Sequence, residues 1–197
     1  MLSAVILSGG ASQRMGSPKA LLPYQGRPFL EHLIAVTSHP KIGARRIVLG
    51  AQAELIADAV RLAADEVVIN AEWEKGQLSS IQAGIRSLPA GTDGMILCLI
   101  DHPLISATLV DELIERFYLG STTPPIVLPV YQGKRGHPVI FSVGVYEELL
   151  VAPPDQGARS VVWAHAGEVA EVVTSEQGCV LNLNDPVTMQ RVLGLQG

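Results

Sequence analysis

The stretch Val5-Ile6-Leu7-Ser8-Gly9-Gly10-Ala11-Ser12-Gln13-Arg14-Met15-Gly16-Ser17-Pro18-Lys19 decides how the rest of this 197-residue sequence is interpreted. Apolar β-forming residues bounded by glycine are typical of a buried strand, which we predict over residues 4–7. In the loop that follows, glycines let backbone N–H groups approach a ligand closely, and Arg14 and Lys19 add positive charge. Such a loop at the end of a strand suits a polyphosphate and indicates a nucleotide-handling enzyme.

Two well-known phosphate loops do not fit this stretch. The P-loop requires G-x-x-x-x-G-K-[ST], whereas five residues separate Gly10 from Gly16 and Lys19 stands three places later, before Ala20. The dinucleotide fingerprint requires G-x-G-x-x-G running into a helix, and the residues from Gly9 onward do not supply that spacing. The loop is therefore of another kind.

Strand-like and helix-like segments alternate through the first 118 residues. Four short apolar runs predict strands, over residues 4–7, 47–49, 67–69 and 95–100. Apolar residues at helical spacing predict the helices between them, over residues 28–37, 54–64 and 79–88, and a fourth helix capped by Ser106. This alternation favours an α/β fold, a Rossmann-like three-layer α/β/α sandwich with a mostly parallel sheet and a ligand at the carboxyl ends of the strands.

The regular alternation of strand-like and helix-like segments stops after Tyr118, which predicts a mixed C-terminal portion of the sheet. The predicted elements of this portion are strands 126–130 and 139–141 joined by a turn, a loop over 153–157, helix 158–166, strand 169–173 and helix 187–195.

Length and composition bound the possible classes of protein. We expect one domain over residues 1–197, because 48% hydrophobic and 17% charged residues describe a compact globule. A net charge of −5 disfavours nucleic acid or an anionic membrane as a partner, and no apolar run is long enough to span a bilayer. We read no signal peptide, and Cys98 and Cys179 read as reduced, buried thiols, so we expect a cytoplasmic protein.

Asp101 is the candidate metal ligand that the strand pattern itself suggests. It directly follows the apolar run 95–100, which puts its carboxylate at the carboxyl end of a central strand. Mg²⁺ prefers one or two carboxylates together with phosphate oxygens, so one well-placed aspartate is meaningful. A turn or capping role before Pro103 is the structural alternative.

The N-terminal loop resembles the signature L-x-x-G-x-S-x-R-M-G-x-x-K of nucleotidyltransferases that activate sugars, isoprenoid precursors and the molybdenum cofactor. The resemblance implies a nucleotide-diphospho-sugar transferase-like fold, Mg²⁺ as cofactor, and catalytic roles for Arg14, Lys19 and Asp101. The nucleotide contacts that it implies in this loop are Leu7, Ser8, Gly9, Gly10, Ser12, Arg14 and Lys19.

Two later segments resemble other motifs of these enzymes. The stretch from Gly76 to Ile85 resembles a G-x-S-x-S-x-x-x-G-L segment, which implies that Ser80, and more weakly Ser79, contacts the nucleoside; a plain helix cap is the alternative. Asn182-Leu183-Asn184-Asp185-Pro186 resembles an N-x-N-T-P motif and puts Asn184 at the metal-side position. Asp185 is the alternative second ligand.

The segment Gly133-Lys134-Arg135-Gly136-His137-Pro138 resembles the G-x-R-G-H-P stretch of molybdenum cofactor cytidylyltransferases, and residues 155–159 resemble their D-x-G-A-R loop. The resemblance implies acceptor contacts from Arg135, Gly136, His137 and Arg159. It also implies transfer of CMP from CTP to the terminal phosphate of molybdopterin, with release of pyrophosphate, and a client molybdoenzyme as a further candidate partner. Ser8-Gly9-Gly10 matches neither the cytidylyl nor the guanylyl loop cleanly, so the preference of CTP over GTP rests on the later motifs.

Three alternative functions stay open at this point. One is a guanylyl- or other small-phosphate nucleotidyltransferase with the same fold. Another is an oxidoreductase that uses NAD(P)H or flavin, which the missing dinucleotide fingerprint disfavours. The third is a non-catalytic molybdopterin-binding chaperone, which would keep its cofactor without releasing pyrophosphate.

Overall fold

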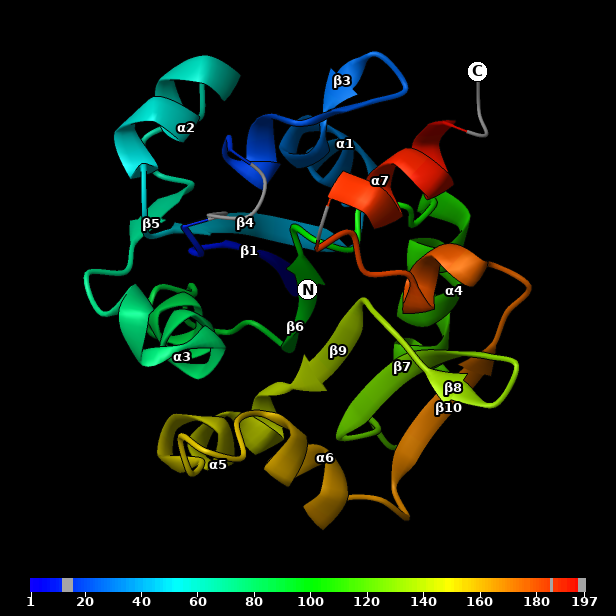
Figure 1. Ribbon diagram of the computed structural model, residues 1–197. Coiled ribbons are helices and arrows are strands. Elements are labelled where there is room, and N and C mark those ends of the chain that lie inside the picture. The colour runs from blue at the N-terminus through cyan, green and yellow to red at the C-terminus, as the bar shows by residue number, and fades with distance from the viewer. Residues whose placement is uncertain (12–15, 185, 195–197) are drawn as a thin grey trace.

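A single sheet forms the centre of the protein and takes strands from both ends of the chain (Figure 1). The computed structural model describes residues 1–11, 16–184 and 186–194, so the predictions for Ser12, Arg14 and Asp185 lie outside the described residues. In sheet order the strands are β10 (Val169–Val173), β7 (Ile126–Tyr131), β9 (Val139–Ser142), β6 (Gly94–Leu99), β1 (Leu2–Ser8), β4 (Ile42–Leu49) and β5 (Val67–Ile69), while β8 (Lys134–Arg135) pairs with β7.

The direction of the strands confirms a mostly parallel sheet with a mixed C-terminal portion. Strands β6, β1, β4 and β5 run parallel, as do β7 and β10, whereas β9 runs antiparallel to both β6 and β7. The carboxyl ends of β1, β4, β5 and β6 therefore meet at one edge of the sheet. Because β9 runs the other way, its first residue, Val139, pairs with Leu97 at that same edge.

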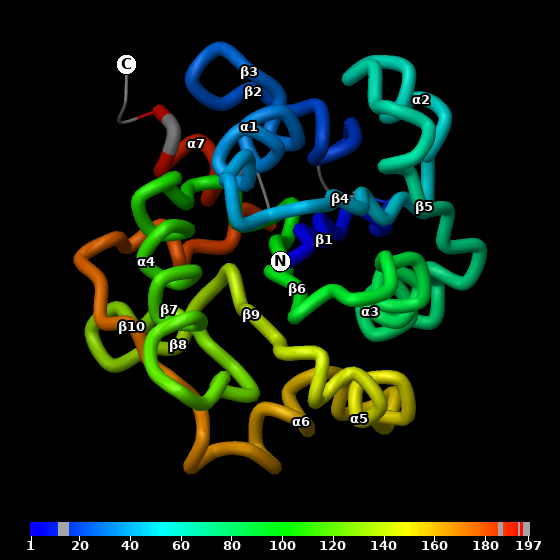
Figure 2. The backbone as a smooth tube through the Cα atoms, turned by 180° about the vertical axis from the view of Figure 1, so that it is seen from behind, coloured from blue at the N-terminus to red at the C-terminus, as the bar shows by residue number. Residues whose placement is uncertain are grey.

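Helices cover both faces of the sheet, as Figures 1 and 2 show from opposite sides. Helices α1 (Phe29–Val36), α2 (Ala53–Val60) and α4 (Ala107–Tyr118) pack on one face, and α3 (Gln77–Arg86), α5 (Tyr146–Val151) and α6 (Arg159–Ala164) on the other. Along β1, Ala4 and Ile6 join the first core cluster and Val5 and Leu7 the second, because successive strand side chains point to opposite faces. The three-layer α/β/α prediction is confirmed.

The element boundaries follow the sequence pattern with a few differences. Helix α2 was expected to reach residue 64 but ends at Val60, because Arg61 adopts a left-handed conformation with φ 54°. The Ser106 cap is confirmed, since its hydroxyl accepts the backbone N–H of Leu109 at 3.0 Å. Helix α5, strand β8 and the hairpin of β2 (Pro23–Tyr24) and β3 (Arg27–Pro28) were not anticipated, and α7 (Pro186–Leu193) stands where the last helix was expected.

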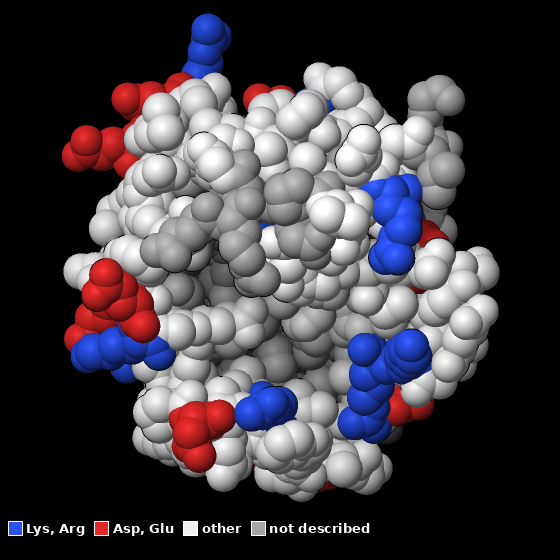
Figure 3. All heavy atoms as spheres, in the orientation of Figure 1, with Lys and Arg blue, Asp and Glu red and all other residues white. Residues whose placement is uncertain are grey.

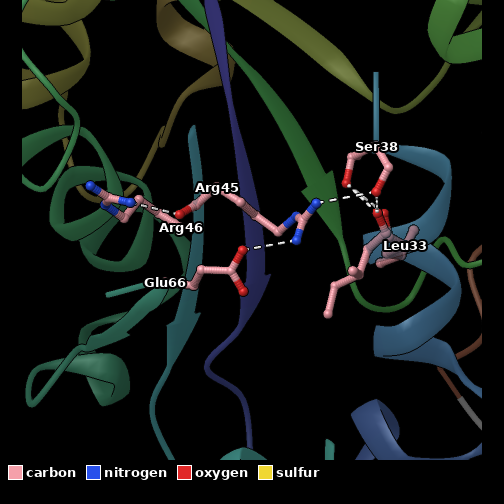
Figure 4. Close-up of polar contacts among 7 residues, drawn as sticks. Leu33, Ser38, Arg45, Arg46 and Glu66 are labelled. Carbon is pink, nitrogen blue, oxygen red and sulfur yellow. Dashed lines mark hydrogen bonds and ion pairs between the residues drawn. The ribbon is translucent and has the colours of Figure 1, made fainter. Parts of the chain in front are cut away.

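Two consecutive arginines on β4 tie the sheet to its neighbours on opposite faces (Figure 4). Arg45 pairs with Glu66, with 2.9 Å between Nη1 and Oε1, and also donates to the Ser38 hydroxyl. Arg46 donates from Nε to the Ser87 carbonyl at 2.9 Å, at the end of α3. This contact holds the C-terminal end of α3 against β4, while the first residues of α3 line the cavity at the other end of the helix.

The described residues also bear on two expectations about the environment of the protein. Among them, no helix combines the length and the apolar character needed to cross a bilayer. Cys98 and Cys179 are both buried and both free thiols, as expected.

Candidate active site

A cavity of about 510 Å³ lies at the carboxyl edge of the sheet. Figure 3 shows this face of the molecule hollowed near its centre. The cavity is lined by the end of β1 and the loop after it, the turn that begins at Lys19, the turn before α3, the start of α3, the end of β6 and the segment before α7. The lining residues are Leu7, Gly9, Gly10, Ala11, Lys19, Trp73, Glu74, Gly76, Gln77, Ser80, Leu99, Ile100, Asp101 and Asn184. The sheet topology therefore gathers chain segments that are far apart in sequence.

The first wall of the cavity is glycine-rich backbone packed with almost no spare room. A Cβ atom at Gly9 would lie 2.9 Å from the Ser80 hydroxyl oxygen. A Cβ atom at Gly50 would lie 2.4 Å from the Gly9 carbonyl oxygen and 2.6 Å from Cβ of Trp73. The backbone contact requires glycine at position 50, and a side chain at Gly9 would displace the Ser80 hydroxyl. The loop after β1 therefore packs closely against Trp73 and the start of α3.

Lys19 and Asn184 meet across the cavity although 165 positions separate them. Lys19 begins the 3₁₀ turn Lys19–Leu21, and its ammonium donates to Oδ1 of Asn184 at 2.5 Å. Both residues line the cavity. The hydrogen bond therefore holds the Lys19 ammonium in the cavity that Gly9 and Gly10 also line, where it can neutralise an anionic ligand.

Asp101 stands two residues after β6 and is held by the segment that precedes α7. Its backbone carbonyl accepts the N–H of Leu183 at 2.8 Å, and its Oδ2 accepts Nδ2 of Asn182 at 2.9 Å. The other carboxylate oxygen, Oδ1, has no hydrogen-bond partner among the described residues. Asp101, Lys19 and Asn184 line the same cavity, which therefore holds one carboxylate together with one amide oxygen that accepts the Lys19 ammonium.

A metal ion would find a sparse donor set here. Within residues 1–11, 16–184 and 186–194, no group of three or more His, Cys, Asp or Glu side chains could hold a metal. Mg²⁺ nevertheless binds through one or two carboxylates when phosphate oxygens supply the remaining positions. Asp101 with Asn184 fits that preference.

Two histidines form a pair behind Asp101. The rings of His102 and His137 lie 4.9 Å apart between centroids, and the backbone N–H of His137 donates to the Cys179 carbonyl at 2.8 Å. Burial lowers the pKa of His102, with the Asp101 charge acting in the opposite direction. Burial also lowers the pKa of His137, to about 4, so both imidazoles are neutral near pH 7. His102 does not line the cavity and neither does His137.

The structure brings together seven of the anticipated site residues and leaves others apart. Leu7, Gly9, Gly10, Lys19, Ser80, Asp101 and Asn184 line the cavity. Ser8 is buried outside the lining. The Ser79 hydroxyl lies against the backbone carbonyls of Glu72 and Gly76, at 3.0 and 2.8 Å.

None of the anticipated acceptor residues is among the residues that line the cavity. Gly136 packs against the Cys179 carbonyl, which a Cβ atom would approach to 2.5 Å. Arg135 pairs with Glu171 at 2.8 Å, in the region of β8 and β10 where Lys and Arg side chains gather in Figure 3. Arg159 donates to the Asp155 carbonyl and lies 5.5 Å from the Trp163 ring centroid.

Several residues of the site were not anticipated from the sequence. Trp73 and Gly50 stood in no motif, and Gln77 stood in the segment 76–85 at a position that was given no role. Their places in the site depend on contacts between distant segments. Asn182 did stand in the N-x-N segment, beside the residue that was chosen. Asn182 and Asn184 stand two positions apart in this segment, and that spacing was the sequence signal that could have pointed to Asn182.

The chain is similar to known proteins over most of its length. The chain is 33% identical to the nicotine blue oxidoreductase of Paenarthrobacter nicotinovorans over 169 residues, which cover 80% of this chain and 79% of the relative. It is 29% identical to the molybdenum cofactor guanylyltransferase of Vibrio atlanticus over 199 residues, covering 98% and 96%.

Solved structures and a family model extend the comparison. The crystal structure of Rv0371c from Mycobacterium tuberculosis superposes with a TM-score of 0.74 at 27% identity, covering 98% of both chains. A manganese complex of Rv0371c superposes with a TM-score of 0.72 at 23% identity and shows the same fold. The model of the MobA-like NTP transferase domain matches residues 4–169. The chain therefore belongs to the family of the MobA-like NTP transferase domain and is a nucleotidyltransferase.

Proposed function

We propose that this nucleotidyltransferase transfers CMP from CTP to the terminal phosphate of molybdopterin, with release of pyrophosphate and with Mg²⁺ as its cofactor. The observation that carries the proposal is the shared cavity. Lys19, Asp101 and Asn184 come from three distant segments and line the same 510 Å³ space beside a glycine-rich loop. That space has the size of a small-molecule ligand site, and its charged groups suit a nucleoside triphosphate.

In this proposal, the chain supplies positioning and charge neutralisation. An oxygen of the acceptor phosphate forms a bond to the α-phosphorus of CTP, the bond between the α-phosphorus and the bridging oxygen breaks, and pyrophosphate leaves with that electron pair. The acceptor oxygen is already anionic, so no general base is required. Lys19 and Arg14 would stabilise the charge that develops on the phosphates. Gly9 and Gly10 would let the backbone approach them.

Asp101 and Asn184 are the residues that would hold Mg²⁺. The ion would screen phosphate charge and polarise the α-phosphoryl group when bound. The hydrogen bond from Asn182 leaves Oδ1 of Asp101 for this purpose. Asp185 remains the alternative ligand to Asn184.

The acceptor is proposed to lie on the Asp101 side of the cavity, near Gly136 and His137. Two motif segments support molybdopterin and CTP, namely residues 133–138 and 155–159. Arg135 and Arg159 would serve an acceptor that extends beyond the cavity. Buried free thiols support the cytoplasm as the location, and a client molybdoenzyme is the proposed recipient of the product.

GTP is the second candidate nucleotide. It is favoured by the relative in Vibrio atlanticus, which is named a guanylyltransferase and matches 98% of this chain. Among residues 1–11, 16–184 and 186–194, no atom beyond Gly10 and its two chain neighbours lies within 4 Å of a Cβ position built at Gly10, so none of them would crowd a larger base on that side.

The test is release of pyrophosphate by the purified protein with each of the four nucleoside triphosphates and Mg²⁺, with and without molybdopterin. We expect release that requires molybdopterin and is fastest with CTP. Asp101→Asn should abolish it, while Asp111→Asn, which alters an exposed aspartate on α4 paired with His39, should leave it unchanged.

Other outcomes would redirect the assignment. Faster release with GTP would make the protein a guanylyltransferase. Molybdopterin binding without any release would favour the chaperone. Oxidation of NAD(P)H in place of nucleotidyl transfer would favour the oxidoreductase.

A further inference from the structure

Asn70 is a buried polar residue that contacts Ser80, one of the residues that line the cavity. Asn70 directly follows β5 and is only 5% exposed. Its backbone N–H donates to the Leu49 carbonyl at 2.8 Å. It does not line the cavity. Its amide instead makes three hydrogen bonds to residues of the turn before α3 and of α3 itself.

A backbone group decides which way the Asn70 amide faces. The N–H of Glu72 donates to Oδ1 of Asn70 at 2.9 Å, and an N–H can only donate. Nδ2 therefore faces the other way, where it donates to the hydroxyl oxygens of Ser79 at 2.9 Å and Ser80 at 3.0 Å. One side chain thus holds two adjacent serines.

The two serines differ in where their own protons can go. The Ser79 hydroxyl has the Glu72 and Gly76 carbonyls as acceptors, so its proton stays within the protein. Ser80 accepts from Asn70, and within the described part of the chain its proton has no acceptor. Ser80 lines the cavity, so its O–H is left to face a ligand there.

We propose that Asn70 is a positioning residue that fixes Ser80 as a hydrogen-bond donor toward the bound nucleotide. The nucleotide group against Ser80 is then an acceptor, such as a base carbonyl, a ring nitrogen or a ribose oxygen. This inference rests on the proposed function in that the ligand of the cavity is a nucleotide. Beyond the proposed function, the inference states that Ser80 donates its hydrogen bond to the nucleotide and that Asn70 sets this direction.

The replacement Asn70→Asp tests the direction of that bond. A carboxylate keeps the acceptor for Glu72 but cannot donate to Ser80, and it draws the Ser80 proton toward itself. Ser80 would then present lone pairs to the nucleotide. We expect the KM for CTP to rise about 10-fold while kcat changes less than threefold, since one hydrogen bond to a bound group is lost.

A double-mutant cycle with Ser80→Ala separates this role from general damage. If Asn70 acts through Ser80, Asn70→Asp adds little to the KM of Ser80→Ala, and the two effects are strongly non-additive. If the effects add, because the new carboxylate acts on the ligand by another route, the inference is overturned. Should Asn70→Asp fail to fold, the same cycle is run with Asn70→Ala.

Gln82→Ala is the matched control. Gln82 also lies on α3, and its side-chain amide donates to the carbonyls of Leu149 and Leu150 on α5, away from the cavity. We expect this variant to lose stability but to keep the KM for CTP. If it raised the KM as much as Asn70→Asp does, the Asn70 effect would be general and the inference wrong.

The wild-type protein distinguishes this inference from the proposed function. If it binds neither CTP nor GTP, the proposed function fails and the inference with it. If it binds one of them and the cycle is additive, the inference alone fails.

Discussion

At the scale of single residues, the hydrogen bond between Lys19 and Asn184 joins an N-terminal and a C-terminal segment of the chain in the candidate active site. Replacing Lys19 by alanine removes the positive charge expected to stabilise the phosphates in the transition state. We expect Lys19→Ala to slow pyrophosphate release about 100-fold, measured as kcat under saturating nucleotide. Lys41→Ala, which removes a lysine lying 5.2 Å from the Tyr118 ring centroid, is the control and should keep its rate. A Lys19→Ala enzyme within threefold of wild type would contradict the assignment.

His137 gives a pH dependence at the same scale. Burial lowers its pKa to about 4, so the folded protein keeps it neutral while the unfolded chain binds a proton below pH 6.5. Stability is therefore present above pH 6.5 and is lost as the pH falls toward 4. At pH 5 the loss is about 2 kcal/mol, and His137→Asn should remove it.

Urea unfolding at pH 7.5 and pH 5 measures this difference. The free energy of unfolding of wild type should fall more between the two pH values than that of His137→Asn. Equal falls would show that His137 is accessible to protons in the folded state.

At the scale of elements, helix α3 lies unusually close to the sheet at Gly84. A Cβ atom there would lie 2.8 Å from Cγ1 of Val5 and 3.4 Å from Cγ2 of Val48. Alanine favours a helix over glycine by about 1 kcal/mol, but overpacking in a filled core costs about 1–3 kcal/mol. We expect Gly84→Ala to lower the free energy of unfolding by about 1 kcal/mol.

Thermal or urea unfolding of the Gly84→Ala and Val5→Ala variants and of their combination tests the contact. Val5→Ala opens space beside the new methyl group, so the combined loss should be smaller than the sum of the single losses. A stabilised Gly84→Ala protein would mean that α3 can shift away from β1 without cost.

The elements also show what the sequence pattern could predict. Strand β5 has its predicted bounds, and α3 begins only two residues before its predicted start. Both elements could be predicted because apolar runs and helical spacing are local signals. The end of α2 at the left-handed Arg61 and the antiparallel direction of β9 depend on packing between distant segments. Lys19 and Asp101 could be anticipated in one cavity from the predicted strand ends, and Asn184 from the resemblance to the N-x-N-T-P motif. The network around Asn70 could not, since it needs the geometry of four backbone and side-chain groups.

At the scale of the whole molecule, the sheet joins β1 near the N-terminus to β10 near the C-terminus through one continuous order of strands. We propose that residues 1–197 form one domain and unfold as a cooperative unit. Thermal unfolding followed by far-UV circular dichroism and by tryptophan fluorescence, from Trp73 and Trp163, should give a single coincident transition. Two separate transitions would divide the chain into two domains.

The proposed function requires that the cavity binds a nucleoside triphosphate. Isothermal titration of the protein with CTP and with GTP in the presence of Mg²⁺ tests this requirement most directly. We predict saturable binding of one nucleotide per chain, tighter for CTP, that weakens at least tenfold in Lys19→Ala and without Mg²⁺. Absence of heat with both nucleotides, or binding unchanged by Lys19→Ala and by removal of Mg²⁺, would contradict it.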